Sequence, residues 1–256
     1  MSLKSSLSAA RKTIKEDLLT LGLVENGRLL VHASLRSLGE LPGGPEDAIA
    51  SILDALGPKG TLMLPALSYA TVNSGNPVFD LANTPTCVGA LPEYFRKRAG
   101  TIRSVHPTHS VCGTGYDAEL LLGEHHLDST PCGKHSPFYK LNELGGQILF
   151  IGCGMNPNTS MHAIEELIEP EYLFADDIDY RIILPEKEMR MRVRRHNFKG
   201  WSQAYARLAD ILDGKDLKTG KVHGADCHLI NVQAMWQKAY KALRADPLFF
   251  VKKIAS

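Results

Sequence analysis

The chain has 256 residues, 44% of them hydrophobic, and its 29 Lys and Arg against 28 Asp and Glu give a formal net charge of +1. This composition is typical of a globular protein and excludes the strongly basic surface of a nucleic-acid-binding protein. No window is long and apolar enough for a membrane span or a signal peptide, so we expect no membrane partner.

Five cysteines form an odd set without a Cys-x-x-Cys pair. This pattern favours reduced thiols over a disulfide framework or a zinc site, so we expect a cytoplasmic protein. The length is most simply that of one large domain over residues 1–256, with two subdomains as the alternative.

The first part of the chain alternates helical and strand patterns. Apolar residues at helical spacing predict a helix over 7–21, and a buried strand follows over 28–32. A second helix is predicted over 45–56 and a second strand over 61–67. Strand, loop, helix and strand begin a parallel sheet covered by helices, so we predict an α/β fold with a largely parallel central sheet flanked by helices.

The rest of the chain is less regular. Residues 68–137 are rich in Gly, Pro, His and Ser, with one convincing helix over 88–99, and such long irregular regions are usually functional. A turn, a short buried strand and a glycine-rich exit occupy 145–154. Strand-like alternation covers 182–193, and helices over 201–212 and 232–244 predict a helical C-terminal part.

Directly after the strand within 145–154, a hydroxyl, an imidazole and a carboxylate are spaced three residues apart, at Thr159, His162 and Glu165. On a helix the three side chains share one face. The carboxylate can then hold the histidine in one tautomer while its other nitrogen accepts a proton, as general-base catalysis requires. The alternative is a common surface pair on a helix, which contributes little.

The loop from His32 to Gly39 leaves the first strand with small residues, two hydroxyls and Arg36. Consecutive backbone amides in such a loop form an anion-binding concavity, and an arginine adds a bidentate phosphate contact. A routine connection with a solvated arginine is the alternative.

Two further segments combine polar residues within apolar surroundings. In 103–111, His106 and His109 lack a third ligand at zinc spacing, so we expect contacts to a phosphorylated cofactor or simple loop packing, and no metal. In 130–141, Cys132 is either a nucleophile or, more commonly for cysteine, a small buried hydrophobic residue.

Four motifs occur together in this order, and with them the chain resembles the aminoglycoside 3-N-acetyltransferase family. They are His32-Ala-Ser-Leu-Arg-Ser-Leu-Gly39, Arg103-Ser-Val-His-Pro-Thr-His-Ser110, His135-Ser-Pro-Phe138 and Thr159-Ser-Met-His-Ala-Ile-Glu165. The resemblance implies an acetyl-CoA-dependent N-acetyltransferase that transfers the acetyl group directly from the thioester to an amine. Acetyl-CoA is then the co-substrate.

The resemblance also implies roles for individual residues. His162 is then the general base, Glu165 orients it, and Thr159 hydrogen-bonds the reacting carbonyl or the thiol. The loop after the first strand would hold the CoA pyrophosphate, and the segment around 104–110 would line the pantetheine channel. The residues expected at the cofactor are His32, Ser34, Leu35, Arg36, Ser104, Val105 and Ser110.

The acceptor implied by the resemblance is the 3-amino group of a 2-deoxystreptamine aminoglycoside. These substrates are polycations and need carboxylates, for which Glu166, Asp176 and Asp177 are the candidates, unless these acids form a solvated helix end and loop. Where resistance enzymes usually carry another acidic stretch, this chain is basic over 190–196. This departure leaves open an anionic amine recognised by one of three arginines, namely Arg192, Arg194 or Arg195.

Two other classes of protein remain as alternatives. A non-catalytic CoA-binding protein would keep the phosphate loop without turnover, although the paired His162 and Glu165 argue against it. A metal-dependent hydrolase would draw on the ten histidines of the chain.

Overall fold

The computed structural model describes residues 3–254, with side chains from residue 9 onward. Their helices are α1 (Leu3–Leu21), α2 (Pro45–Leu56), α3 (Ala90–Lys97), α4 (Ala118–Leu122), α5 (Pro137–Glu143), α6 (Ser160–Glu165) and α7 (Val232–Ala245), with 3-10 helices η1 (Leu35–Leu38), η2 (His125–Leu127) and η3 (Tyr205–Asp210). The strands are β1 (Arg28–Ala33), β2 (Thr61–Pro65), β3 (Val78–Asp80), β4 (Ile102–Arg103), β5 (Val111–Gly115), β6 (Gln147–Ile151), β7 (Phe174–Ile183), β8 (Glu188–His196), β9 (Trp201–Gln203), β10 (Leu217–Val222), β11 (Ala225–Asn231) and β12 (Val251–Lys253).

A seven-stranded sheet with the order β10-β11-β6-β1-β2-β5-β4 forms the centre of the fold. Strand β1 runs parallel to both of its neighbours, with Leu30 in register with Met63 of β2 and Ile148 of β6. The remaining neighbours pair antiparallel. The predicted α/β class with a helix-flanked central sheet is confirmed. Within this seven-stranded sheet, the parallel pairs are those of β1 with β2 and with β6.

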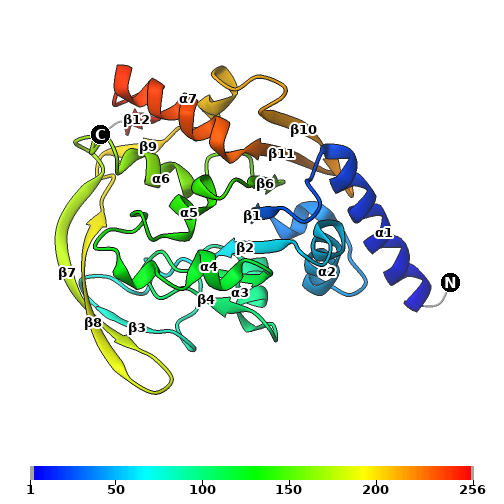
Figure 1. Ribbon diagram of the computed structural model, residues 1–256, viewed down its shortest axis with the longest axis horizontal. Coiled ribbons are helices and arrows are strands. Elements are labelled where there is room, and N and C mark those ends of the chain that lie inside the picture. The colour runs from blue at the N-terminus through cyan, green and yellow to red at the C-terminus, as the bar shows by residue number, and fades with distance from the viewer. Residues whose placement is uncertain (1–2, 255–256) are drawn as a thin grey trace.

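Helices cover both faces of this sheet (Figure 1). Leu29 and Val31 of β1 face one core, which contains apolar residues of α1, α2 and α3, whereas Leu30 faces the other core with residues of α4 to α7. Such alternation of buried side chains is expected of a strand buried on both sides. The carboxyl ends of the parallel strands therefore meet at one edge of a doubly covered sheet, which is where open α/β folds bind ligands.

A second sheet, β3-β7-β8, stands beside the first, and its long β7–β8 hairpin forms one flank of the molecule (Figure 1). It has its own apolar cluster, which includes Phe79, Tyr180 and Val193. This hairpin brings the acidic run after α6 against the basic run at 190–196, and Asp177 pairs with Arg192 at 2.8 Å. Many of these charges neutralise one another on an exposed surface.

The sequence predictions agree with most elements of the structure. The helix at 45–56 is confirmed as α2 (Pro45–Leu56), those at 88–99 and 232–244 appear as α3 and α7, and the strand at 61–67 ends at Pro65. The helix expected over 201–212 is wrong, because Trp201–Gln203 forms a strand paired with Val251–Lys253 and only a 3-10 helix follows. The β10–β11 hairpin also lies in the part expected to be helical.

No helix among residues 3–254 has the length and apolar character needed to cross a membrane. The single domain over residues 1–256 stays a prediction.

Candidate active site

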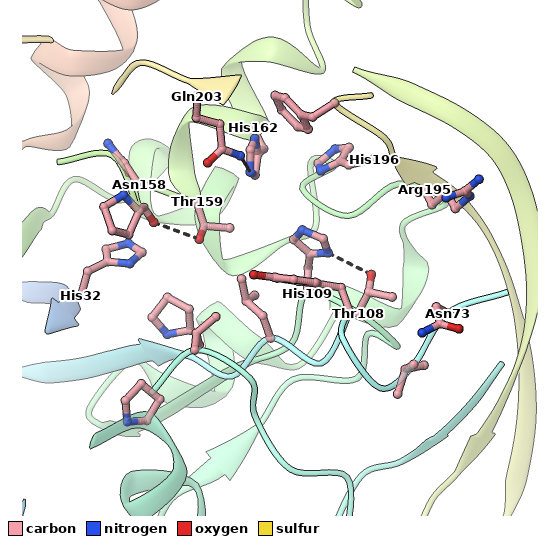
Figure 2. Close-up of a pocket in the computed structure, with 18 of the residues that line it drawn as sticks. His32, Asn73, Thr108, His109, Asn158, Thr159, His162, Arg195, His196 and Gln203 are labelled. Atoms are coloured by element: carbon pink, nitrogen blue, oxygen red, sulfur yellow. Dashed lines mark hydrogen bonds between the residues drawn. The ribbon is translucent and has the colours of Figure 1, made fainter. Parts of the chain in front are cut away.

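A cavity of about 560 Å³ opens where β1 and β2 end, beside the start of α6 and the end of β8 (Figure 2). Its wall is formed by Val31, His32, Ala33, Pro65, Leu67, Tyr69, Val72, Asn73, Val88, Pro92, Thr108, His109, Cys153, Pro157, Asn158, Thr159, His162, Tyr180, Arg195, His196, Asn197, Phe198 and Gln203. A cavity of this volume, mostly apolar with a few polar groups, is typical of small-molecule sites.

His162 and Glu165 are three residues apart and therefore share one face of α6, where His162 Nδ1 lies 2.8 Å from Glu165 Oε2. Glu165 is fully buried and also accepts hydrogen bonds of 2.8 Å from the hydroxyls of Tyr172 and Tyr205. Burial and the nearby Glu165 raise the pKa of both tyrosines, so their hydroxyls stay protonated and act as donors. These contacts hold a carboxylate that orients His162 with Nδ1–H toward it.

The second ring nitrogen of His162 is left with a lone pair. It lies 3.4 Å from the side-chain amide nitrogen of Gln203, a group that can only donate. The ring packs against Phe198 and His196, with centroids 5.1 Å and 4.9 Å away, so it is held in one orientation. His162 and Thr159 both line the cavity. The arrangement can accept a proton from a molecule bound there.

Two further histidines stand beside His162 (Figure 2). His196 Nε2 lies 2.8 Å from Glu166, and His109 Nδ1 lies 2.9 Å from the Thr108 hydroxyl. Burial holds the pKa of both histidines well below the usual value, so they are neutral at physiological pH. One ring nitrogen each from His109, His162 and His196 lies within 4.8 Å of the other two, which is a possible metal-binding group.

Glu166 does not line the cavity, and its side chain is only 7% exposed. Besides His196, it accepts hydrogen bonds from the Thr130 hydroxyl and the Cys132 amide, at 2.6 Å and 2.8 Å. Burial raises the pKa of Glu166 to about 7. The structure therefore brings Glu166 behind the wall, in contact with a lining histidine.

The other two predicted substrate acids are exposed on β7, outside the residues that line the cavity. Asp177 is paired with Arg192, and Asp176 is its neighbour on the strand. The structure thus does not bring Asp176 and Asp177 together with His162.

The predicted cofactor residues divide into two groups. His32 lines the cavity and stacks on Phe150 with a centroid distance of 5.1 Å, and burial lowers its pKa to about 3. Ser34 follows β1 directly, and η1 begins with Leu35 and an exposed Arg36. These residues border the cavity beyond Ala33 without lining it.

The second group lies behind the cavity wall. The Ser104 hydroxyl contacts His125 at 2.9 Å and accepts from the Val111 amide, while the Ser110 hydroxyl donates to the Ala66 carbonyl at 2.8 Å. Val105 packs against the core of the second sheet. These side chains hold the loop together and do not line the cavity.

Cys132 is fully buried, and burial together with nearby carboxylates raises its pKa well above the usual value. A protonated, inaccessible thiol is not a nucleophile, so the buried hydrophobic residue is the correct alternative.

Sequence reasoning missed several residues around His162, namely Tyr172, Tyr205, Phe198, Gln203 and His109 as its neighbour in space. The first four come after Glu165 in the sequence and approach His162 or Glu165 only through the tertiary fold. Two of them, Gln203 and Tyr205, lie in residues 201–212, where a regular helix was predicted. The sequence carried no signal for Tyr205, which reaches Glu165 from 40 residues away.

Comparison with known proteins gives one consistent family. The model of the family described as aminoglycoside 3-N-acetyltransferase matches residues 30–244. Aminoglycoside N(3)-acetyltransferase IV from Salmonella sp is 30% identical over 237 residues, covering 91% of this chain and 87% of that protein. Aminoglycoside N(3)-acetyltransferase VII from Streptomyces paromomycinus is 26% identical over 259 residues, covering 90% of each.

Solved structures agree with this match. A histidine-to-alanine mutant of aminoglycoside acetyltransferase AAC(3)-IVa, in complex with a gentamicin, has a TM-score of 0.81 at 29% identity, covering 94% of this chain and 90% of that one. AAC-IIIb in a binary complex with CoASH also has a TM-score of 0.81, at 26% identity, covering 92% of this chain and 96% of that one.

Proposed function

The chain belongs to the aminoglycoside 3-N-acetyltransferase family, and we propose that it moves the acetyl group of acetyl-CoA onto an amine with His162 as the general base. Acetyltransferase activity and the acetyl-CoA co-substrate accord with the family, in which AAC-IIIb binds CoASH. The observation that carries the proposed base is the buried Glu165, 2.8 Å from His162 Nδ1, behind a cavity that the same imidazole lines.

The reaction follows from the state of the His162 ring. An ammonium group must lose a proton before it attacks, and the lone pair on His162 Nε2 accepts it. The free amine then adds to the thioester carbonyl and forms a tetrahedral oxyanion. The nitrogen of this intermediate is positively charged, and it loses its second proton to solvent as collapse breaks the carbon–sulfur bond and forms the amide; the departing CoA thiolate takes the first proton from the imidazolium. No acyl-enzyme is required.

Glu165 and Thr159 assist different stages of this reaction. The Glu165 carboxylate stabilises the imidazolium that forms during the proton transfer. Thr159 precedes α6, is 4% exposed and lines the same wall, so its hydroxyl can donate to the developing oxyanion or to the sulfur.

We assign the CoA side of the cavity to the carboxyl end of β1. His32 lines the wall there, and the backbone amides of Ser34, Leu35 and Arg36 follow in a loop that suits a pyrophosphate, with an exposed guanidinium beside it. Ser104, Val105 and Ser110 then support the pantetheine side of the wall from behind.

The first candidate acceptor is the 3-amino group of a 2-deoxystreptamine aminoglycoside. Its support is the family and the relative AAC(3)-IVa, whose structure contains a gentamicin. The polycation would then be attracted by three carboxylates that do not line the cavity, namely Glu166, Asp176 and Asp177. Direct contact with them would require these side chains to move toward the cavity.

A second candidate acceptor is an amine that also carries an anionic group, and the lining of the cavity favours it. No Asp or Glu is among the described residues that line the cavity, whereas Arg195 is. Its neighbours Arg192 and Arg194 are paired with carboxylates, and no such pair involves Arg195 within residues 9–254. An ammonium group of a polycationic acceptor 4 Å from this guanidinium would be repelled by about 1–4 kcal/mol, depending on the solvent around it.

The position of Arg195 fits the binding of an acceptor. Arg195 and Asn73 lie at the end of the cavity opposite His32, with His162 between (Figure 2). The reacting amine would thus sit at His162, the cofactor toward His32 and the anionic group at Arg195.

The test is the rate of CoA release from acetyl-CoA with a panel of aminoglycosides, amino acids and phosphorylated amino sugars. Turnover of aminoglycosides supports the first candidate, and turnover of anionic amines alone supports the second. Absence of turnover with every amine in the panel would count against amine acetylation.

The variant Arg195→Gln separates the two acceptors further. For an anionic acceptor it removes a charge-assisted hydrogen bond of about 1.5–3 kcal/mol and raises the acceptor KM by about 10- to 100-fold. Arg190→Gln is the matched control, because Arg190 is exposed on the same strand and does not line the cavity. For an aminoglycoside, Arg195→Gln leaves the KM unchanged or lowers it.

A further inference from the structure

We propose that His109, His162 and His196 form a Zn²⁺ site, and that Zn²⁺ bound there blocks the base at His162. The three imidazoles come from separate parts of the chain: the loop before β5, helix α6 and the end of β8. One nitrogen of each lies within 4.8 Å of the other two. The site faces the cavity, since all three residues line it (Figure 2).

Each ring has one nitrogen engaged by a neighbour, which leaves the other for a metal ion. Glu165 contacts His162 Nδ1, Glu166 contacts His196 Nε2, and the Thr108 hydroxyl contacts His109 Nδ1, at 2.8, 2.8 and 2.9 Å. Zinc-binding histidines almost always donate a hydrogen bond from their other ring N–H to a carboxylate, a carbonyl or water, which fixes the ring and raises its basicity. Two of these three histidines have a buried carboxylate in that position.

A second observation comes from the free nitrogen of His196. Its Nδ1 is buried and has no hydrogen-bond partner among the described residues. Leaving such a group unsatisfied costs about 1–3 kcal/mol, which a metal–nitrogen bond would offset.

The geometry requires a modest contraction. Zinc–nitrogen bonds of about 2.0–2.1 Å place tetrahedral nitrogens about 3.4 Å apart, so separations of up to 4.8 Å must shorten by about 1.4 Å or less. The rings stand at steep angles, with interplanar angles of 61° to 79°. Rotation of side chains can therefore bring three ring edges to one point, leaving a fourth position toward the cavity, as in zinc sites with three protein ligands.

Competing ligands near the site are weak. Cys153 also lines the cavity, but its thiol contacts the backbone carbonyls of His32 and Gly154, each at 3.5 Å. The amide of Gln203 lies 3.4 Å from His162 Nε2, and zinc would displace it from that nitrogen.

Zinc bound to His162 Nε2 uses the lone pair that would accept the proton of the amine. Metal binding and acetyl transfer then exclude each other. The inhibition rests on the proposed role of His162 as base, whereas the binding of the metal does not, so the two are measured separately.

Binding is measured on metal-free full-length protein, without turnover. Co²⁺ is added first, since a site with three histidines and one water gives the intense visible absorption of four-coordinate cobalt. Zn²⁺ is then titrated in competition with a chromophoric chelator. We expect one equivalent of Zn²⁺ with a Kd below about 1 μM, about 8 kcal/mol of binding free energy.

The variants His109→Gln and His196→Gln remove one ligand each, and we expect each to weaken Zn²⁺ binding by at least about 100-fold. Glu166→Gln, which changes only the group behind His196, should weaken it by about 10- to 100-fold. His126→Gln and Cys87→Ser are the controls, because they remove a histidine and an exposed thiol outside the cluster and should keep the Kd within about twofold.

Weak binding by the wild type, with a Kd above about 100 μM and no four-coordinate cobalt spectrum, overturns the site whether or not the variants fold. Unchanged Zn²⁺ affinity in His109→Gln and His196→Gln, with melting temperatures near the wild-type value, overturns it as well. If Zn²⁺ binds through these histidines but CoA release continues at saturating metal, the site stands and the block of His162 is refuted. Inhibition that a chelator reverses supports both parts.

Discussion

Replacing Glu165 by glutamine tests whether the charge behind His162 assists the proton transfer. Glutamine has the shape of glutamate, and its carbonyl can take the position of Oε2, where it accepts from His162 Nδ1 and Tyr205. The amide nitrogen then faces the hydroxyl of Tyr172, which can rotate to accept. The tautomer of His162 is kept, and the change removes mainly the negative charge.

The size of the effect follows from the contact distance. Unit charges 2.8 Å apart attract by about 6 kcal/mol at an effective dielectric constant of about 20, an upper bound on the contribution of the charge to the imidazolium. The lower bound is the difference of about 1–2 kcal/mol between a charge-assisted and a neutral hydrogen bond. Between these bounds, at 1.36 kcal/mol per tenfold change in rate, we expect kcat to fall by about 100-fold.

The assay is the initial rate of CoA release at saturating acetyl-CoA and acceptor. The KM for acetyl-CoA should stay within about twofold, because Glu165 is fully buried and does not line the cavity. Glu169→Gln is the matched control, since this exposed glutamate pairs with Arg194 and makes no contact with His162. A kcat for Glu165→Gln within threefold of the wild type would refute the orienting and stabilising role of the carboxylate.

Three further changes test separate parts of the structure. Tyr205→Phe removes a hydrogen bond of 2.8 Å to Glu165, about 0.5–1.5 kcal/mol, and should lower kcat by about 2- to 12-fold; a rate equal to that of the exposed-site control Tyr116→Phe would contradict this. Leu149→Ala empties a fully buried position in β6 and should lower the free energy of unfolding by about 2–5 kcal/mol in urea titrations, whereas a loss below 1 kcal/mol would mean that the site is not packed as described. The Arg96 side chain holds the pKa of Glu93 far below 4.5, so Glu93 stabilises the fold above about pH 4.5 and this contribution is lost as the pH falls through the folded-state value. Wild type should therefore exceed Glu93→Gln in free energy of unfolding at pH 7 by a margin that shrinks in acid, and a margin independent of pH would exclude this linkage.

The pairing of His162 with Glu165 could be predicted from the sequence because its geometry is local. Steps of three on a helix bring His162 and Glu165 together whatever the rest of the fold does, and the structure confirms their contact. The strand before the motif was equally readable as a short apolar run bounded by glycines, and it forms β6 at the centre of the sheet.

Contacts between distant segments were not readable. Tyr205 contacts Glu165 from a 3-10 helix, and the segment before it, Trp201–Gln203, pairs with β12 as a strand. Periodicity gives no information on such pairing, because it reports the burial of a segment and not its partner.

The sequence indicated which polar residues lie near the site. It did not indicate whether their side chains point into the cavity. Ser104 and Ser110 have hydroxyls suited to a cofactor, but their hydrogen bonds go to His125 and the Ala66 carbonyl within the loop. Glu166 follows Glu165 directly, but the helical turn of one residue points its side chain toward Thr130 and His196. Whether a polar group faces a cavity or its own loop depends on packing that a single sequence does not reveal.

The measurement that tests the central claim most directly compares the rate of acetyl transfer with the affinity for CoA in His162→Asn. Asparagine keeps a polar side chain at the cavity wall and cannot accept the proton of the amine. We predict a fall in kcat of at least about 100-fold, with a Kd for CoA within about twofold of the wild type, because general-base catalysis contributes about 10²- to 10⁴-fold. Near-normal turnover in His162→Asn would contradict the assignment of His162 as the base.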